Sequence, residues 1–239
     1  MMQKQVNLLV FMISLVLVSC GGTVIPTNTI QEMKTEFEAK EAYTIVLYDM
    51  DLVDGVYKHQ YKVFDVIGGK KAEISTTDWK DVGDDFFLLH EDDLGMEIFS
   101  KMEDGTYNHL ITPPGFTHFV GHTNFGQWTT FGGLLEDTAA VWQFDVNNEN
   151  AMLVESELVL SGLNITKGEY EGYKDRYYLN RPFYGTHYNT DTTKYGTRSH
   201  HWLIMRPFFY TRKRQKQNFN KPYDGAFSYE NRGGGGFGK

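Results

Sequence analysis

The sequence has one cysteine, Cys20, among its 239 residues. With a single cysteine, the chain forms no intramolecular disulfide and no zinc–thiolate site. It also has no apolar run of about 20 residues, the length that an ordinary transmembrane helix needs. Three catalytic signatures are missing as well: a serine in G-x-S-x-G, a phosphate-binding loop, and a Rossmann glycine fingerprint after a strand. These absences exclude the best-known hydrolase and nucleotide-binding classes, and we expect no cofactor.

The one cysteine ends a segment, Leu17-Val18-Ser19-Cys20, that resembles the lipobox of bacterial lipoproteins. Lys4 gives the chain a positive start, and residues 6–18 form an apolar run typical of a signal peptide. By this resemblance, residues 1–19 are a signal peptide that is removed, and Cys20 carries acyl chains such as palmitate. Two such chains suffice for stable anchoring. The alternative is a free thiol at the end of an ordinary secretion signal or of an uncleaved anchor.

The lipobox resemblance implies a bacterial cell-envelope protein that is attached to a membrane through its N-terminal lipid. Gly21, not an aspartate, follows Cys20. The inner-membrane retention signal of some Gram-negative bacteria is therefore absent. Because that rule does not hold in every phylum, the inner and the outer membrane both stay open.

Charge is distributed unevenly along the chain, whose formal net charge is −8. Residues 21–170 carry 26 acidic side chains against 9 lysines, a net charge of −17, whereas residues 171–239 carry 5 acidic against 13 basic side chains, a net charge of +8. All seven arginines and ten of the fifteen tyrosines also lie beyond residue 168. Since the hydrophobic periodicity ends there too, we expect the sequence pattern of a folded domain to end near this position.

Before residue 168 the sequence predicts an α+β fold. Thr29 and Glu32 have the spacing of a capping box, and the residues after Thr29 predict a short amphipathic helix. A second helix is predicted over residues 77–89, capped by Thr77. Residues 151–160 fit either a strand or a short helix. Glycine and proline turns separate further β-prone runs, which predict an antiparallel β-meander. Its strands are expected at residues 43–48, 56–66, 72–76, 96–100, 106–111, 116–120, 125–131 and 139–146.

We therefore expect four parts in the chain. Residues 1–19 are the signal peptide and residues 20–28 a tether. Residues 29–167 form the α+β domain, with an antiparallel meander and one or two short helices. Residues 168–239 form a basic, Tyr- and Gly-rich C-terminal segment that is poorly ordered in part, because a run of glycines fixes no backbone conformation by itself.

Two histidine pairs are candidate metal ligands. His118 and His122 have the spacing that places two imidazoles on one face of a helix. However, residues 113–115 are Pro-Pro-Gly, which disfavours a helix, and in a strand the two histidines would lie about 13 Å apart. His200 and His201 would point to opposite faces if this segment were extended, and we interpret them as a solvated polar pair. We expect no metal here, and a metal-binding protein would require His118 and His122 to converge with a carboxylate.

Acidic residues gather in several short groups. Residues 49–55 match a calcium loop only in part, because Val53 and Asp54 stand where an oxygen ligand and a glycine are needed. A turn with Asp54 and Gly55 at its tip is the simpler interpretation. Paired carboxylates catalyse glycoside hydrolysis only when they lie about 5 to 10 Å apart around a substrate. For the remaining groups, at residues 84–85, 91–93 and 136–137, we expect a solvated surface.

Four tryptophans raise the possibility of a sugar-binding platform. They are Trp79, Trp128, Trp142 and Trp202. A strand-rich core buries aromatic side chains of this kind in any case. Burial is therefore the interpretation that we prefer.

The C-terminal segment contains a compact cationic cluster, which consists of Arg212, Lys213, Arg214 and Lys216. Clusters of at least four Lys or Arg residues attract anionic lipid headgroups. Nucleic acid is not expected as a partner of an exported protein. The cluster therefore contacts an anionic membrane, an acidic envelope protein or the acidic surface of its own domain, and the sequence leaves these three open.

Five short blocks are similar to those of an uncharacterised group of bacterial envelope lipoproteins. They are Asp78-Trp79, Leu94-Gly95-Met96-Glu97-Ile98, Pro113-Pro114-Gly115-Phe116, Phe125-Gly126-Gln127-Trp128 and Gly236-Phe237-Gly238-Lys239. This resemblance implies neither an activity nor a site residue.

Together these patterns predict a lipid-anchored envelope protein of accessory or binding type, with no catalytic residues assigned. Its acidic domain and basic tail would contact a membrane or a protein partner. The alternative is an envelope hydrolase or a carbohydrate-binding module that uses carboxylates and tryptophans.

Overall fold

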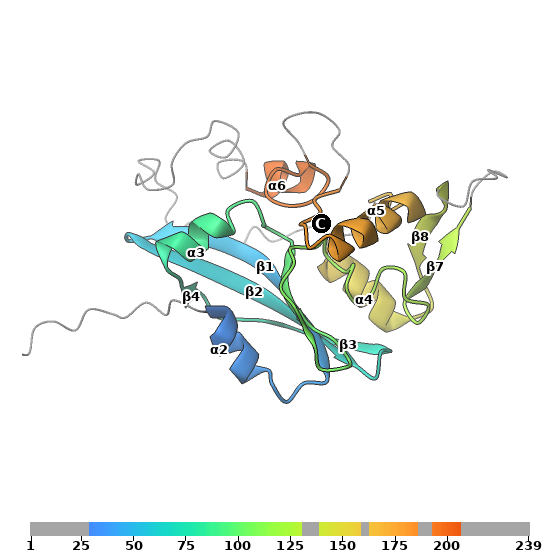
Figure 1. Ribbon diagram of the computed structural model, residues 1–239, viewed down its shortest axis with the longest axis horizontal. Coiled ribbons are helices and arrows are strands. Elements are labelled where there is room, and N and C mark those ends of the chain that lie inside the picture. The colour runs from blue at the N-terminus through green and yellow to red at the C-terminus, as the bar shows by residue number, and fades with distance from the viewer. Residues whose placement is uncertain (1–28, 131–138, 159–162, 186–192, 207–239) are drawn as a thin grey trace, which may run out of the picture.

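The structure is a computed structural model that describes residues 29–130, 139–158, 163–185 and 193–206. Along this part of the chain, α2 and α3 each precede a run of strands, and the last three elements are helices (Figure 1). Among the described helices, none is long and apolar enough to span a membrane. The elements are α2 (Thr29–Glu36), β1 (Ala42–Val53), β2 (Val56–Ile67), β3 (Lys71–Thr76), β4 (Lys80–Asp81), α3 (Asp84–Leu89), β5 (Glu97–Lys101), β6 (Tyr107–Asn108), β7 (Gly126–Thr129), β8 (Val141–Phe144), α4 (Glu149–Glu157), α5 (Lys167–Tyr178) and α6 (His200–Met205).

The long hairpin of β1 and β2 is the centre of the fold. Both strands are rich in β-branched and aromatic residues, which favour a pleated surface. Asp54 and Gly55 connect them with φ angles of 52° and 79°. Two consecutive positive φ angles are what a two-residue type I′ turn requires. The turn expected at this position is thus confirmed.

All strand pairs in the described part are antiparallel. The main sheet has the order β3-β2-β1-β5-β6, and β4 pairs with β2 beyond the end of β3. β7 and β8 form a separate two-stranded sheet. The α+β class and the antiparallel sheet predicted from the sequence are therefore confirmed.

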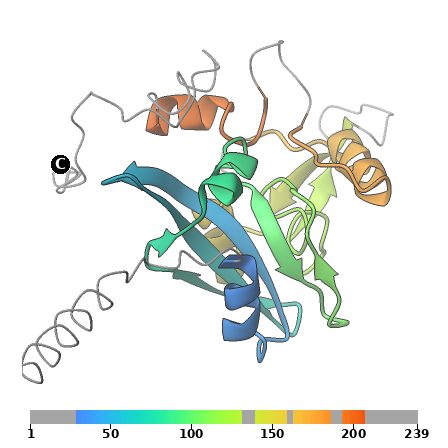
Figure 2. The ribbon, with the colours of Figure 1, turned by 60° about the vertical axis from the view of Figure 1, so that its left-hand side comes forward.

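The main sheet is covered on both faces, because alternate residues of β1 and β2 enter two different hydrophobic clusters. Tyr43, Ile45 and Leu47 of β1 point into one cluster, which α2 and α3 close with Met33 and Phe87. On the opposite face, the cluster includes residues of β7 and β8, α4 and α5 (Figures 1 and 2). Residues 43–47 of β1 are therefore buried on both faces of the sheet.

Two predicted elements are wrong. The predicted helix over residues 77–89 is reduced to α3, because Thr77 does not act as a cap: its hydroxyl accepts a hydrogen bond from the Tyr61 amide at 3.1 Å. Residues 116–120 form turns, not a strand. Gly115, with a φ angle of 83°, starts a tight bend in which its carbonyl accepts from the amides of Phe119 and Val120 at 3.0 and 2.8 Å.

The structure also decides the open alternative at residues 151–160. A helix, α4, covers Glu149–Glu157, and Asn148 caps its N-terminus by accepting from the amides of Asn150 and Ala151. Asn is among the best residues at such a position, because its side chain satisfies backbone N–H groups that have no partner within the helix.

Partial order was expected beyond residue 168, and the described residues there pack on the domain. α5 buries Tyr173, and Tyr195 lies in the same cluster. Residues 193–206, which we call the strap, run back over the domain and end in α6. The α+β domain therefore does not end at residue 167.

Candidate functional site

Glu97 is the most deeply buried carboxylate of the described chain, with 1% of its surface exposed. It lies in β5, where apolar neighbours hold it inside the domain. Three donors reach its two oxygens: the Gly115 amide to Oε1 at 2.6 Å, the Thr112 hydroxyl to Oε2 at 2.9 Å, and the Thr117 hydroxyl to Oε2. Glu97 therefore fastens the bend at residues 115–120 to the main sheet.

Burial raises the pKa of Glu97 from its ordinary 4.5 to about 7, although the hydrogen bonds from Thr117, Thr112 and Gly115 oppose this shift. A carboxyl group that titrates near neutral pH has the proton affinity of a general acid or base. Its oxygens, however, are occupied by fixed donors from its own chain. Their positions suit a structural clamp that binds one segment to another.

A second polar cluster lies on the other side of the sheet, near α3. His90 and Asp93 contact each other through Nδ1 and Oδ2 at 2.8 Å, and the Tyr184 hydroxyl donates to Oδ1 of Asp93 at 2.6 Å. Asp93 is 2% exposed. A carboxylate and the histidine that it orients are two of the three members of a catalytic triad, but the described contacts include no serine or threonine hydroxyl on the histidine.

His59 extends this cluster into the hydrophobic core. It is fully buried, and its Nδ1 lies 3.0 Å from the Tyr61 hydroxyl, while its Nε2 has no hydrogen-bond partner among the described residues. The rings of Phe86, Phe87 and His90 surround it. Burial, followed by the nearby His90, lowers the pKa of His59 from 6.5 to about 3. The ring is therefore neutral at physiological pH.

Two of the ionic contacts that hold the strap lie near its two ends. Lys194 pairs with Glu169 of α5, and both side chains are only 4% exposed. Arg206, at the end of α6, pairs with Asp49 of β1. Between them, the Trp202 indole lies against Gly95, where a side-chain Cβ would come within 2.8 Å of the indole nitrogen. Glycine is needed there both for this close approach and for its φ angle of 78°.

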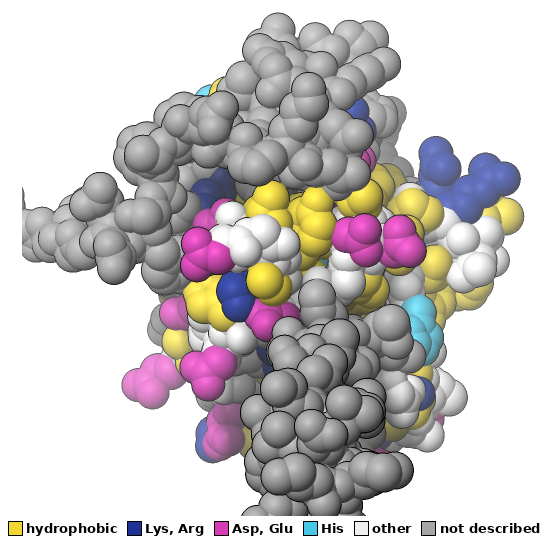
Figure 3. Space-filling model, turned by 90° about the vertical axis from the view of Figure 1, so that its left-hand side faces the viewer, with side chains coloured by type: hydrophobic (Ala, Val, Ile, Leu, Met, Phe, Trp, Pro, Cys, Tyr) yellow, Lys and Arg dark blue, Asp and Glu magenta, His cyan; other side chains and the backbone are white. Residues whose placement is uncertain are grey.

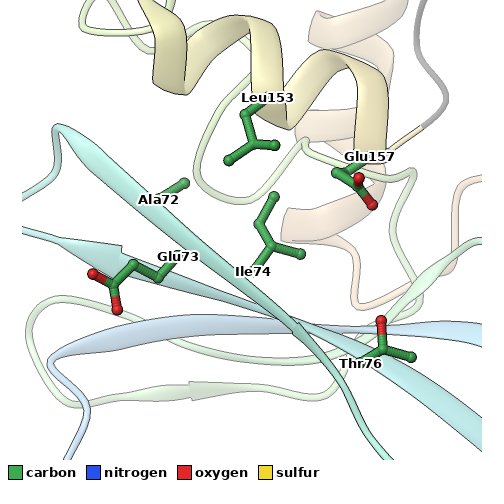
Figure 4. A pocket seen from close by; sticks show the side chains of 6 residues that line it. All are labelled: Ala72, Glu73, Ile74, Thr76, Leu153 and Glu157. Atoms are coloured by element: carbon green, nitrogen blue, oxygen red, sulfur yellow. The ribbon is translucent and has the colours of Figure 1, made fainter.

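An open groove of about 580 Å³ lies between β3 and α4. Its lining is drawn in Figure 4: Ala72, Glu73, Ile74 and Thr76 from the strand, and Leu153 and Glu157 from the helix. The two carboxylates point away from each other in this view, and each has a lysine partner, Lys71 for Glu73 and Lys62 for Glu157. The groove therefore does not present a pair of free carboxylates.

No protein-family model, no curated protein and no solved structure matches this chain. The site must therefore be interpreted from its own geometry.

The histidine pairs do not form a metal site in the described structure. His118 is buried and His122 is exposed, both in the turns that follow Gly115. His200 and His201 are the first two residues of α6. Within the described ranges, no group of three or more His, Cys, Asp or Glu side chains could hold a metal ion.

The acidic groups are only partly solvated. Asp84 and Asp85 are exposed at the start of α3, as expected. The prediction of a solvated surface is wrong for Asp93, which is buried in contact with His90 and Tyr184. Figure 3 shows the side of the molecule that carries the β1–β2 turn and α3, where Asp and Glu side chains are spread between hydrophobic ones.

The tryptophans serve mainly in packing. Trp142 is buried, and Trp128 packs edge-on against it with ring centroids 5.1 Å apart. Trp202 lies on Gly95, and Trp79 is half-buried. None of the four lines the groove between β3 and α4.

Several expected sites lie outside the described residues. They are the lipidation residue Cys20, the acidic pair at 136–137, and the cationic cluster of Arg212, Lys213, Arg214 and Lys216.

Sequence reasoning missed the buried ionisable groups. Glu97 had a recognisable signal, since it is the one charged residue between Met96 and Phe99 in an apolar run. His90 and Asp93 have a three-residue spacing that suits a local contact. The Lys194–Glu169 and Arg206–Asp49 pairs left no such signal, because their partners are far apart in the sequence.

Proposed function

We propose that this chain is a lipid-anchored protein of the bacterial cell envelope that acts by binding a partner. The lipobox resemblance at Leu17–Cys20 carries the proposal. The fold is compatible with it, because Thr29, the first described residue, is 1% exposed and so already belongs to the packed domain. Residues 21–28 then serve as a short tether between the lipid and the domain.

The buried ionisable groups support a binding role over a catalytic one. Glu97 holds the bend at residues 115–120, Asp93 holds Tyr184, and Glu169 holds Lys194. Each of these carboxylates joins two distant parts of the chain. Their roles are those of structural contacts that fix a surface.

The anchor is tested by metabolic labelling with a palmitate analogue. The wild-type chain should incorporate the label and stay with membranes after washing with high salt, whereas the Cys20→Ala variant should do neither. Thr23→Ser, a change outside the lipobox that keeps the cysteine, is the matched control. Incorporation of the label by Cys20→Ala would contradict lipidation at this residue.

The binding role is tested by crosslinking in native membranes, followed by capture of the full-length protein. The comparison variant lacks residues 207–239 only, because α5 and the strap are part of the fold. An envelope partner that is recovered with both variants would bind the domain, and one recovered only with the full chain would bind the tail. Recovery of no partner by either variant, together with hydrolysis of cell-wall glycans by the purified protein, would replace this proposal with the hydrolase alternative.

A further inference from the structure

β3 is an edge strand of the main sheet, and in the described part of the chain it pairs with β2 alone. The Thr77 amide donates to the Tyr61 carbonyl at 2.9 Å, just beyond the end of the β2–β3 ladder. Backbone groups of an antiparallel strand point alternately towards its partner and away from it. The N–H and C=O groups of Ala72, Ile74 and Thr76 therefore point away from β2, at the outer edge of the sheet.

The domain itself covers the first of these outward amides. The Ala72 amide donates to Oδ1 of Asn150, in the first turn of α4, at 3.4 Å. This contact agrees with the outward direction and places the start of α4 beside the edge of the sheet. Ile74 and Thr76 have no such partner for their amides among the described residues. An unpaired strand edge of this kind is a template for another strand.

The groove between β3 and α4 lies along this edge (Figure 4). One wall contains the three strand residues with outward backbone groups, and the other contains Leu153 and Glu157 of α4. Leu153 is 43% exposed, and Ile74 is half-buried. The volume of about 580 Å³ is within the usual range of ligand pockets. A segment that paired with β3 would thus find apolar side chains beside the free backbone groups.

The surroundings of the groove are acidic. α4 has three glutamates and no Lys or Arg, and two of them, Glu149 and Glu157, share a helix face with Leu153 because all three are spaced by four residues. Glu73 lies on the strand side, and the lysines that pair with Glu73 and Glu157 offset part of this charge. Residues 21–170 as a whole have a net charge of −17. A cationic partner is therefore favoured over a second copy of the chain, because two domains with the same strong charge repel each other.

We propose that β3 and the groove beside it bind an extended, cationic segment of a protein partner, which adds a strand to the main sheet. Backbone hydrogen bonds to Ile74 and Thr76 would give affinity, and alternate side chains of the segment would give specificity. Apolar side chains would lie against Ile74 and Leu153, and cationic ones, on the other face of the strand, near Glu73. This inference deepens the proposed binding role and rests on it, but it does not depend on the lipid anchor.

The test measures hydrogen exchange of the full-length protein in a nonionic detergent, with a blocked peptide of alternating lysine and valine as the probe. In the free protein the amides of Ile74 and Thr76 should exchange fast, whereas those of Glu73 and Ser75, which face β2, should be protected. Saturating probe should slow exchange at Ile74 and Thr76 by about tenfold or more, because these amides then exchange only when the added strand opens. A peptide with glutamate in place of lysine should leave their exchange unchanged.

Two substitutions with matched controls identify the contacts. Thr76→Pro removes one outward donor at a position where an edge strand tolerates proline, and it should weaken binding of the probe by about fivefold. Thr76→Val keeps the donor and should bind as the wild type does. Leu153→Asn removes an apolar wall and should weaken binding, whereas Met152→Asn changes a similarly exposed neighbour outside the groove and should not. Slow exchange at Glu73 verifies that each variant keeps the β2–β3 pairing.

Each contrary result has its own meaning. Amides of Ile74 and Thr76 that are protected in the free protein would overturn the proposal: the chain itself would occupy the edge if protection were independent of concentration, and a second copy if it appeared only at high concentration. Protection by neither peptide would reject the site, and equal protection by both would reject the cationic partner. Equal binding by Thr76→Pro and Thr76→Val would reject the added strand.

The binding role itself is judged separately, by crosslinking in native membranes with the wild type and Thr76→Pro. A partner that both proteins capture alike would keep the binding role and reject this edge as its site. Loss of the partner from Thr76→Pro, but not from Thr76→Val, is the result that we expect.

Discussion

The hydroxyl of Tyr184 donates a 2.6 Å hydrogen bond to Asp93, a residue 91 positions earlier in the chain. This contact joins the segment after α5 to the loop after α3. Asp93 also contacts His90, the residue that ends α3, so a single buried carboxylate connects the end of α3 with the segment after α5. The strap adds two contacts beside it, since the Thr197 hydroxyl donates to the Glu91 carbonyl at 2.7 Å and accepts from the Leu94 amide at 3.1 Å.

Tyr184→Phe should lower the free energy of unfolding by about 1.5 to 3 kcal/mol, because the buried carboxylate of Asp93 loses a donor. Urea denaturation of the full-length protein in detergent measures this loss. Tyr177→Phe, which removes a hydroxyl from the more exposed Tyr177, is the control and should change little. An equal effect of the two changes would show that the Asp93 contact has no special role.

Lys194→Met should be the more damaging change, with a loss of about 3 to 5 kcal/mol. It leaves the Glu169 carboxylate buried without its cation, and one of its oxygens, Oε1, already has no partner in the described structure. Lys71→Met, which breaks an exposed pair with Glu73, should have no measurable effect. Recovery of stability in the double variant with Glu169→Leu would identify the uncompensated charge as the cause, and a double variant as unstable as Lys194→Met would contradict this explanation.

The sequence predicts the parts of the fold that follow from local patterns. The β1–β2 hairpin is such a part, because alternating side chains and the Asp54-Gly55 turn lie next to each other in the chain. A short helix near Thr29 was also predicted, and α2 lies there, over Thr29–Glu36, with Met33 as its buried anchor. The antiparallel class follows from the short turns.

The predictions fail where a distant partner decides the conformation. The sequence predicts a strand at residues 116–120, but they form turns because Gly115 allows a tight bend and Glu97 accepts hydrogen bonds from this segment. Thr77 reads as a helix cap, but Tyr61 uses its hydroxyl. The strap has no periodicity because it packs through single side chains, such as Tyr195 and Trp202.

Glu97→Gln should make the protein more stable at alkaline pH. The native carboxyl group has a pKa of about 7, raised by burial, whereas the unfolded one has its ordinary pKa of 4.5. The native state thus binds more protons between these values, and the free energy of unfolding falls as the pH rises from 4.5 to 7. At about 1.4 kcal/mol per unit, the loss reaches roughly 3 kcal/mol.

Glutamine avoids this loss, since its amide oxygen can accept from Gly115 and its amide nitrogen can donate to the threonine hydroxyls. We expect similar stabilities for wild type and Glu97→Gln near pH 5, and a more stable variant at pH 8. Urea unfolding at both pH values measures the difference. A variant that is less stable at pH 8 would show that the ionised carboxylate is itself favourable.

His59 and His118 should make the fold sensitive to acid. Burial lowers the pKa of His59 from 6.5 to about 3 and that of His118 from 6.5 to about 4. Below pH 6.5 the two histidines bind protons in the unfolded chain, whereas in the native state their rings stay neutral. The free energy of unfolding therefore falls with falling pH. Each histidine contributes up to about 1.4 kcal/mol per pH unit. Glu97 acts in the opposite direction over pH 4.5 to 7, so the fall should be steeper in Glu97→Gln.

His59→Phe isolates one of these contributions. Phenylalanine suits the aromatic surroundings of Phe86 and Phe87 and does not titrate. Between pH 6 and 4 the free energy of unfolding of this variant should therefore fall less steeply than that of the wild type. The two slopes should differ by close to the value for one proton, about 1.4 kcal/mol per pH unit. Tyr178→Phe, at an exposed aromatic position, should keep the wild-type slope. If His59→Phe also kept it, His59 would have to accept a proton in the native state, and its Nε2, which has no partner among the described residues, would then need one that forms on acidification.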